Sequence, residues 1–301
     1  MKGIQRRGRG RRIFCLKVTK GQAESERKKL ISEGLLNMDF SPRSDGEYVY
    51  FPLLRKIPGS MRLYFTQARK RTLTLEEALR KLGVPQSGMS KSYDIFGDIA
   101  LVEIPKGMTR YAKRIAKAVM AVNPAVKVVA MKTGPISGEY RVRNLKVIGG
   151  ENRTDTYHKE TGCIFHVDIA KSYFSPRLSF ERRRISGLVR LKERVFVPFA
   201  GVGPFPIIIA KQHPDVEVYA NELNPYAFRS MEENIRINHV PNVKAYPGDV
   251  RDFAARFAGQ ADRIIMPIPM AADRFMDVAF VLARKGATAH IYMFEKSEDD
   301  A

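Results

Sequence analysis

From Val195 to the C-terminus, short apolar segments alternate with stretches of helical character, and this rhythm constrains the fold more than any other feature of the chain. Strand–helix alternation of this kind predicts an α/β fold with a mixed, mostly parallel, doubly wound sheet. In such sheets the ligand lies beyond the carboxyl ends of the strands, so functional residues are expected in the loops that follow them. The expected strands are Val195–Ala200, Val216–Glu222, Val243–Tyr246, Arg263–Pro267 and Ala287–Phe294.

The first of these strands runs into a glycine turn, FAGVGPF, at residues 199–205. Here Gly201 and Gly203, close to Phe199, would let the backbone turn tightly against a ligand. The second strand ends at Glu222, about 20 residues further on, where a carboxylate can accept hydrogen bonds from ribose hydroxyls. The third strand is followed by Asp249, which could receive a base amino group. A generic turn, a surface acid and a helix cap are the structural alternatives for these three features.

The order of glycine turn, ribose acid and base-reading acid is typical of class I, Rossmann-like methyltransferase domains, and it predicts S-adenosylmethionine as the cofactor. NAD is the competing cofactor, but the third glycine of the dinucleotide fingerprint is missing and no hydride-transfer site follows. The sulfonium of S-adenosylmethionine already makes its methyl group electrophilic. The enzyme therefore needs only to position the methyl group and to activate the acceptor.

Basic residues are concentrated in the first two thirds of the chain. Residues 1–190 contain 39 Lys and Arg against 17 Asp and Glu, a net charge of +22, whereas residues 191–301 contain 13 against 15, a net charge of −2. A segment with this charge repels itself without a polyanionic partner, so the asymmetry predicts nucleic-acid binding; a merely charge-rich protein is the alternative. The first dozen residues, six of them basic, are expected to form an RNA-binding arm rather than a targeting signal.

The sequence gives no indication of a membrane segment or of a metal site. No stretch reaches the roughly 18 consecutive apolar residues that a membrane helix needs, and no signal-peptide pattern opens the chain. Cys15 and Cys163 form no CxxC pair or Cys/His cluster, so neither a zinc site nor a disulfide framework is expected. A reducing cytosol is the expected compartment, and the protein is expected to be a monomer.

Two small, basic α+β units are expected before the α/β domain. The first would contain a strand at Ile13–Val18, a helix at Glu24–Glu33 and a strand at Glu47–Leu54, and would end near Pro58-Gly59. We divide the chain into an N-terminal RNA-contacting domain (1–65), a middle RNA-binding domain (66–160) and a catalytic domain (161–301). The elements expected in and just after the middle domain are Leu75–Leu82, Ile99–Ile104, Tyr111–Val122, Val126–Met131, Glu139–Ile148 and the hairpin Tyr157–Ala170.

Several stretches together carry a resemblance to a known family. They are the glycine turn, GEYR (138–141), the hairpin His158–Asp168, YFSPRL (173–178) followed by Glu181-Arg182, and NELNPYAF (221–228). Through them, the chain from about residue 130 to 295 resembles the tRNA (guanine-37-N1) methyltransferases of the archaeal and eukaryotic type. The resemblance implies a class I catalytic domain, a middle domain that helps to grip the anticodon stem-loop of tRNA, and an N-terminal domain that reaches elsewhere on the folded tRNA.

The resemblance also implies roles for individual residues. Glu181 would be the general base at guanine N1, Arg141 the cation at O6, and Tyr173 a support for the flipped base. The chemistry agrees, because guanine N1 carries a proton and is a poor nucleophile at neutral pH. The alternatives are a carboxylate paired with Arg184 or Arg182 for Glu181, and a surface strand cation for Arg141. By the same analogy, the cofactor-binding residues are Arg182, Phe199, Gly201, Gly203, Glu222, Leu223, Asp249, Val250 and Pro267, and the substrate-binding residues are Arg177, Pro267 and Pro269.

Two positions depart from the family pattern. After the fourth strand the family often has Asn-Leu-Pro, whose Asn helps to hold the target guanine, whereas this chain has MPIP at residues 266–269. Pro267 can accept a hydrogen bond at its carbonyl and can shape the pocket, but it supplies no side-chain amide. Pro198 stands where the family tends to carry an acidic residue. Proline is tolerated near the end of a strand although it donates no hydrogen bond to the sheet.

Other functions stay open at this point. Related enzymes of wybutosine synthesis transfer the aminocarboxypropyl group of the same cofactor, and a dual-specificity methyltransferase would act on guanosine and on a tricyclic intermediate at the same tRNA position. The full FSPRL…ER pattern argues against aminocarboxypropyl transfer. From a different class, the chain could be a non-catalytic RNA-binding module, which would not need Glu181.

Overall fold

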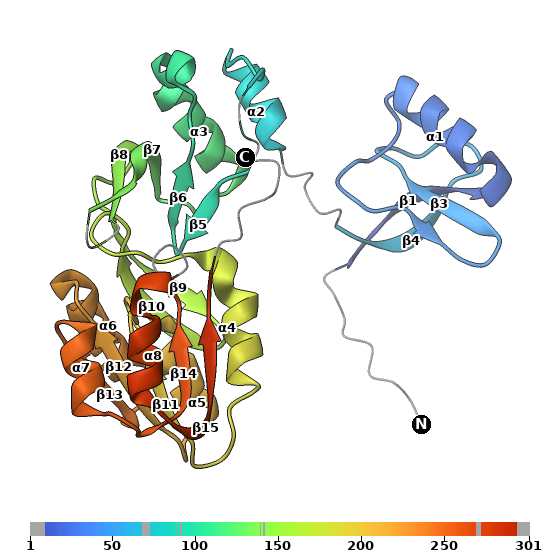
Figure 1. The fold of residues 1–301 in the computed structure, drawn as a ribbon. Coiled ribbons are helices and arrows are strands. Elements are labelled where there is room, and N and C mark those ends of the chain that lie inside the picture. Colours follow the sequence, from blue (N-terminus) through green and yellow to red (C-terminus); the bar gives the residue numbers. More distant parts are fainter. Residues whose placement is uncertain are drawn as a thin grey trace, which may run out of the picture. The chain divides into compact units, whose positions relative to one another are not determined.

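The computed structural model describes residues 10–67, 73–88, 90, 92–138, 140, 142–268 and 272–293. The chain divides into two units, Met1–Thr72 and Leu73–Ala301 (Figure 1). Arg141 and Pro269, and most of the expected basic arm, lie outside the described residues. The division into three domains at 65/66 and 160/161 stays a prediction.

The N-terminal unit is an antiparallel four-stranded sheet with one helix. The strands have the order β2-β3-β1-β4, so β1 pairs with both β3 and β4. A small core of buried apolar side chains, among them Leu30 and Phe51, joins the helix to the sheet. The elements are β1 (Gly10–Thr19), η1 (Lys20–Gln22), α1 (Ala23–Ser32), β2 (Arg43–Ser44), β3 (Tyr48–Pro52) and β4 (Met61–Thr66).

The strand, helix and strand expected in this unit are confirmed, but its expected end near Pro58-Gly59 is wrong. The chain turns there, with Gly59 at φ +77°, and returns as β4 to pair with β1. A Pro-Gly pair marks a turn, and a turn can connect two strands of one sheet as readily as it can end a unit.

The second unit begins with a mixed four-stranded sheet of order β5-β6-β7-β8. Strands β6 and β7 are parallel and are joined through α3, whereas β5 and β8 pair antiparallel at the edges. Thr74 and Glu77 form a capping box that fixes the start of α2. The elements are α2 (Leu75–Lys81), β5 (Asp94–Phe96), β6 (Ile99–Val102), η2 (Lys106–Tyr111), α3 (Ala112–Val122), β7 (Val128–Ser137) and β8 (Val142–Gly150).

A hairpin of β9 (Asp155–Glu160) and β10 (Cys163–Asp168) connects this sheet to the α/β part, as expected. Two buried asparagines of α6 (Pro225–Asn238) hold the outer edge of β10. Asn234 accepts from the amide of His166 at 2.6 Å, and Asn238 accepts from the amide of Ile164 at 2.8 Å. An edge strand whose amide and carbonyl groups are bonded by side chains does not need another strand beside it.

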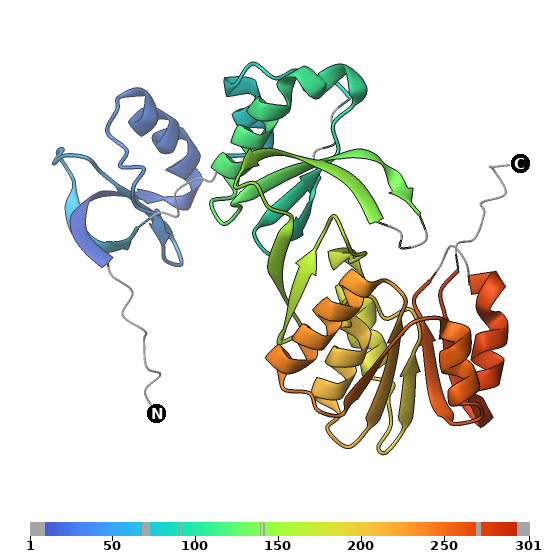
Figure 2. The same cartoon turned by 90° about the vertical axis from the view of Figure 1, so that its left-hand side faces the viewer.

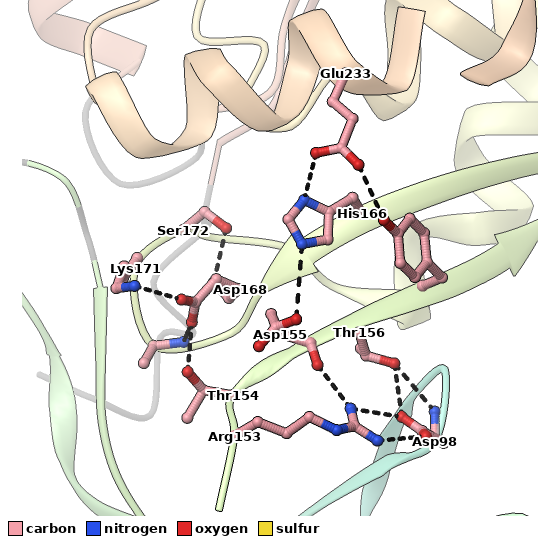
Figure 3. A network of polar contacts seen from close by, with 12 residues as sticks. Asp98, Arg153, Thr154, Asp155, Thr156, His166, Asp168, Lys171, Ser172 and Glu233 are labelled. Carbon is pink, nitrogen blue, oxygen red and sulfur yellow. Dashed lines mark hydrogen bonds and ion pairs between the residues drawn. The ribbon is translucent and has the colours of Figure 1, made fainter. Parts of the chain in front are cut away.

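A polar network fastens the hairpin to the β5–β6 turn (Figure 3). Arg153 forms a two-pronged pair with Asp98, at 2.6 and 3.0 Å, and Thr156 donates to the same carboxylate at 2.8 Å. Gly97, at φ +52°, lies so close to the hairpin that a Cβ would come within 2.4 Å of the Tyr157 carbonyl oxygen. These contacts join the β5–β8 sheet to the hairpin that leads into the α/β part.

The α/β part confirms the doubly wound parallel sheet. Its order is β13-β12-β11-β14-β15, and all four strand pairings are parallel; the antiparallel pairings of a mixed sheet belong instead to the β5–β8 sheet. The order reverses at β11 (Arg194–Val197), which is the switch point where such sheets bind ligands. The other strands are β12 (Glu217–Glu222), β13 (Val243–Pro247), β14 (Ala261–Met266) and β15 (Ala283–Ile291).

Helices cover both faces of this sheet (Figure 2). Along β11, Val195 and Val197 join the core formed with α4, α5 and α6, whereas Phe196 joins the core formed with α7 and α8. This alternation explains the continuous apolar run of the strand, because both of its faces are buried. The remaining elements are η3 (Pro176–Leu178), α4 (Ser179–Ser186), α5 (Pro204–Gln212), α7 (Val250–Arg256), η4 (Ala272–Phe275) and α8 (Met276–Leu282).

Candidate functional site

A cavity of about 500 Å³ opens at the carboxyl ends of β11, β12, β13 and β14. Its position matches the expectation that ligands bind beyond the strand ends at the switch point. Eight of the residues proposed from the sequence lie on its wall: Tyr173, Phe199, Gly201, Glu222, Leu223, Asp249, Val250 and Pro267.

The glycine turn after β11 has the backbone conformation that its residues suggest. Phe199, Gly201 and Gly203 have φ values of +59°, +58° and +86°. A Cβ on Gly203 would come within 2.8 Å of Met231 Cγ, so this glycine permits the close approach of α6. Gly203 precedes α5 and does not line the cavity, whereas Gly201 does. Phe199 adopts the left-handed conformation without being glycine, and such local strain is concentrated at functional sites.

Glu222 ends β12 and holds the glycine turn in place. One carboxylate oxygen accepts from the amide of Gly201 at 2.7 Å, and the other accepts from the amide of Asn224 at 2.8 Å. Burial raises the pKa of Glu222, although these backbone hydrogen bonds oppose the shift. A carboxylate has about four acceptor positions, and the amides of Gly201, Leu223 and Asn224 use three of them, so Glu222 can organise the turn and still accept one hydroxyl group from a ligand.

Asp249 lies at the start of α7 and has two roles in the structure. Its Oδ1 accepts from the amide of Arg251 at 2.7 Å, which makes it the helix cap that was the structural alternative for this residue. The same residue also lines the cavity. The adjacent Val250 is buried, and Leu223, which also lines the cavity, is 40% exposed.

Two residues of the cavity wall, Arg251 and Phe275, were not predicted from the sequence. The rings of Phe199 and Phe275 meet edge to face with centroids 4.9 Å apart, and the guanidinium of Arg251 lies 4.9 Å from the Phe275 centroid. For Arg251, the position just after Gly248-Asp249 was a weak indication that it lies at the cavity. For Phe275 the sequence held no such indication, because this residue lies outside the expected strands and the loops that directly follow them.

A second unforeseen group is Arg143, two residues beyond the proposed Arg141. Its guanidinium lies 5.0 Å from the ring of Tyr173 and donates to the carbonyl of Phe174 at 2.9 Å. Its Nη1 is buried and has no hydrogen-bond partner within the described part of the chain. Desolvation lowers the pKa of Arg143. Together with Tyr173, it lines a neighbouring cavity of about 400 Å³.

Glu181, the proposed base, lies outside the residues that line the main cavity. Arg184 donates to both oxygens of its carboxylate at 2.7 Å, and the hydroxyl of Tyr292 donates to Oε1 at 2.7 Å. The hydrogen bonds from Arg184 lower the pKa of Glu181, with a smaller contribution in the same direction from Tyr292. The ion pair with Arg184 is the structural alternative that the sequence had left open.

Arg182 and Arg177, proposed for cofactor and substrate, also lie outside the main cavity. Arg182 is 2% exposed and forms a two-pronged pair with Glu160 at 2.6 and 2.5 Å, and it donates to the carbonyl of Ser175 at 2.9 Å. Arg177 pairs with Asp94 at 2.7 Å on the surface. The structure therefore brings eight of the proposed site residues together around one cavity. Arg182 and Arg177 are instead paired with carboxylates of the protein itself.

The structure records neither a candidate metal site nor a membrane span in the residues that it describes. No group of three or more His, Cys, Asp and Glu side chains is arranged to hold a metal ion in that part of the chain. No helix among the described residues has the length and apolar character needed to cross a membrane.

Three family models match successive parts of the chain. They are the tRNA methyltransferase 5 N-terminal domain (residues 15–61), the TYW2 N-terminal domain (75–154) and the TRM5/TYW2 methyltransferase domain (156–300). Among characterised relatives, tRNA (guanine(37)-N(1))-methyltransferase Trm5b of Pyrococcus abyssi is 38% identical over 291 residues, which are 95% of this chain and 86% of that protein.

Solved structures agree with these matches. The complex structure of aTrm5 and tRNALeu is similar with a TM-score of 0.71 and 32% identity, over 95% of this chain and 89% of that one. The crystal structure of Methanocaldococcus jannaschii Trm5 in complex with adenosine is similar with a TM-score of 0.61 and 31% identity, over 95% and 88% of the two chains.

Proposed function

The chain belongs to the TRM5/TYW2 methyltransferase family, and from this premise we propose that it transfers the methyl group of S-adenosylmethionine to N1 of guanosine 37 in tRNA, next to the anticodon. The observation that carries the proposal is the cavity at the sheet's switch point. There a glycine turn held by Glu222 lies beside Tyr173, and Asp249 lines the same cavity. The cavity thus combines groups suited to a nucleoside with an aromatic residue suited to a base.

The residues of the cavity fit S-adenosylmethionine. Its volume of about 500 Å³ lies in the range of small-molecule sites. Glu222 offers carboxylate lone pairs to ribose hydroxyls, Asp249 offers an oxygen to a base amino group, and Phe199 and Phe275 offer apolar surface to a purine ring. The complex of the Methanocaldococcus jannaschii relative with adenosine supports a nucleoside as a ligand of this chain. When bound, S-adenosylmethionine supplies an electrophilic methyl group.

For the acceptor, we assign to Glu181 the removal of the N1 proton and to Tyr173 a contact with the flipped guanine. Arg141 is proposed to stabilise the negative charge that develops on O6. Tyr173 is 36% exposed and lines the cavity, so a base that leaves its stack can reach it. Glu181 lies close to the same edge of the sheet, as its partner Tyr292 shows. Tyr292 follows directly after β15, and the amide of Tyr292 donates to the carbonyl of Met266, which precedes the cavity residue Pro267.

The partner is proposed to be tRNA. The net charge of +22 on residues 1–190 and the complex of a relative with tRNALeu support this choice. A monomeric state and a cytosolic location stay predictions.

The test is incubation of the purified protein with labelled S-adenosylmethionine and unmodified tRNA transcripts that carry guanosine or another base at position 37, followed by nucleoside mass analysis. The guanosine transcript should gain one methyl group, about 14 Da, and the others should gain nothing. Glu181→Gln should bind tRNA at least as tightly as the wild type does and slow single-turnover methylation by about 10²-fold or more. The matched control is Glu217→Gln, at the opposite end of the sheet, which should methylate at the wild-type rate.

A second candidate function is action on a modified guanosine at the same position, by transfer of an aminocarboxypropyl group or as a dual-specificity methyltransferase. One observation favours keeping it, because residues 75–154 match the TYW2 N-terminal domain. The mass analysis separates these reactions, since an aminocarboxypropyl group adds about 101 Da rather than about 14 Da. Unchanged transcripts would favour a non-catalytic RNA-binding module.

A further inference from the structure

The proposed base does not have a free carboxylate in this structure. Arg184 occupies both oxygens of Glu181, and Tyr292 donates a third hydrogen bond to Oε1. A carboxylate that is bonded in this way has few lone pairs left for an incoming N1–H group. Its charged form is also stabilised, which makes it a weaker proton acceptor. Because Arg184 makes the larger contribution to this stabilisation, proton transfer to Glu181 becomes easier when Arg184 leaves the carboxylate.

The two partners differ in how easily they can be displaced. The Arg184 side chain is 49% exposed, and it pairs with a carboxylate that is 23% exposed. Exposed ion pairs within one helix contribute little to stability, so their exchange for another partner has a low cost. Tyr292, in contrast, is half-buried and packs against Phe205 with ring centroids 6.0 Å apart. Arg184 is therefore the partner that can leave while Tyr292 stays.

The surroundings of Arg184 suit an RNA phosphate as its new partner. Arg182, Arg183 and Arg184 are consecutive, but Arg182 is buried in its pair with Glu160, so only the last two face solvent. The aromatic ring of Phe180, in the same helix, is 72% exposed. Guanidinium groups bind phosphate oxygens in the same two-pronged geometry that they use for carboxylates. A phosphate diester beside α4 would thus compete directly with Glu181 for Arg184.

We propose that Arg184 binds a backbone phosphate of the RNA substrate, and that this exchange releases Glu181 for proton transfer while Tyr292 keeps it oriented. The inference rests on the proposed function, because it takes Glu181 as the base. It gives Arg184 and Tyr292 the role of positioning residues. The base is then poorly reactive until RNA is bound, so proton transfer is coupled to the arrival of the substrate.

The charged and titratable groups that face Glu181 are Arg184 on its own helix, His290 in β15 and Tyr292 directly after β15. Removing Arg184 from a complex in which it still held Glu181 would raise the pKa of that carboxyl group, since the cation favours the ionised form. The acid limb of the rate profile would then move to higher pH. If phosphate has already taken Arg184 in the wild-type complex, removing the arginine leaves the acid limb where it was.

The experiment compares Arg184→Gln with Arg183→Gln, which removes the same charge one residue away. Single-turnover methylation at saturating tRNA is measured across the acid range for the full-length wild type and both variants, and binding of an anticodon stem-loop RNA is measured as a function of salt. We expect superimposed acid limbs. We also expect a salt slope that is smaller by about one for Arg184→Gln, with weaker binding than Arg183→Gln shows. An acid limb shifted to higher pH in Arg184→Gln, or an unchanged salt slope, would overturn the proposal.

Tyr292→Phe tests the second part of the proposal, that Tyr292 keeps Glu181 oriented. Loss of a hydrogen bond to a charged group should lower the single-turnover rate at saturating tRNA by about tenfold and leave RNA affinity unchanged. A weakened affinity with an unchanged rate would contradict the orienting role. Glu181→Gln separates the assignment of Glu181 as the base from the phosphate contact of Arg184. If this variant methylates at the wild-type rate, the base assignment fails. The phosphate contact is still tested by the salt slope of Arg184→Gln. Thermal melting of each variant checks that it is folded.

Discussion

Replacing Glu160 by Gln should destabilise the second unit of the chain by about 3–5 kcal/mol, the usual cost of removing one partner of a buried ion pair. The side chains of Glu160 and Arg182 are each 2% exposed and meet through two hydrogen bonds of 2.6 and 2.5 Å. A glutamine keeps one acceptor oxygen and leaves the guanidinium without a counter-charge in a site closed to water. Because Arg182 also donates to the carbonyl of Ser175, a displaced arginine would loosen the turn that leads into α4.

Urea denaturation, followed by circular dichroism, measures the loss. The control is Glu151→Gln, which breaks an ion pair with Arg153 at 2.7 Å in which the carboxylate is 60% exposed. That variant should lose no more than about 1 kcal/mol, because surface pairs contribute little. The double variant Glu160→Leu with Arg182→Met should regain most of the loss, since it leaves no buried charge unpaired. A cost for Glu160→Gln as small as that of the control would refute this reasoning.

The same double variant decides what Arg182 does. The family resemblance places this arginine near the cofactor, whereas in the structure it lies outside the cavity wall and is bonded to Glu160 and Ser175. If its role is to hold the turn before α4, the folded double variant should bind S-adenosylmethionine within about threefold of the wild-type affinity, since it loses no direct ligand contact. A loss of about tenfold or more, measured by calorimetry, would instead place Arg182 in contact with the cofactor.

Three further predictions follow from the described contacts. Gly203→Ala should weaken S-adenosylmethionine binding and lower the free energy of unfolding by about 1–3 kcal/mol. The reason is that Gly203 has a φ of +86° and that the new Cβ would collide with Met231. A melting temperature equal to that of the wild type would contradict this prediction. The hydrogen bonds from Arg153 lower the pKa of Asp98, so its contribution to stability is present above the ordinary aspartate pKa of about 4 and is lost as pH falls below it. Asp98→Asn should therefore show a flatter acid dependence in urea titrations than the wild type does. Affinity for tRNA should fall by orders of magnitude between about 50 and 200 mM salt, and a flat response in filter binding would argue against a phosphate footprint on the basic part of the chain.

The parts of the fold that the sequence predicted well are those set by local patterns. The continuous apolar run of β11 and the turn that follows it require only burial on both faces and two glycines with positive φ. Glu222 and Asp249 could be placed because strand ends of a parallel sheet meet at one edge. The strand β4 was missed because a Pro-Gly turn does not show whether the chain leaves a sheet or returns to it.

Partners distant in the sequence could not be predicted in this way. Glu160 precedes Arg182 by 22 residues and Tyr292 follows Glu181 by 111 residues, and no periodic pattern relates a side chain to a partner so far away. The same holds for Arg143, whose buried guanidinium is explained only when the ring of Tyr173 and the carbonyl of Phe174 are seen beside it. Such residues determine how a site is held together, although they leave little trace in a motif.

The structural and the functional interpretation of one residue need not exclude each other. Asp249 caps α7 through Oδ1 and still lines the cavity, and Glu222 holds the glycine turn with one acceptor position left for a ligand. Glu181 differs, because its main partner is the cation Arg184, which stabilises the ionised carboxylate and so weakens it as a proton acceptor. For the first two residues, the scaffold contact and the ligand contact can exist together, so binding costs no rearrangement. For Glu181 the contacts compete, and the base can act only in a complex that supplies Arg184 with another anion.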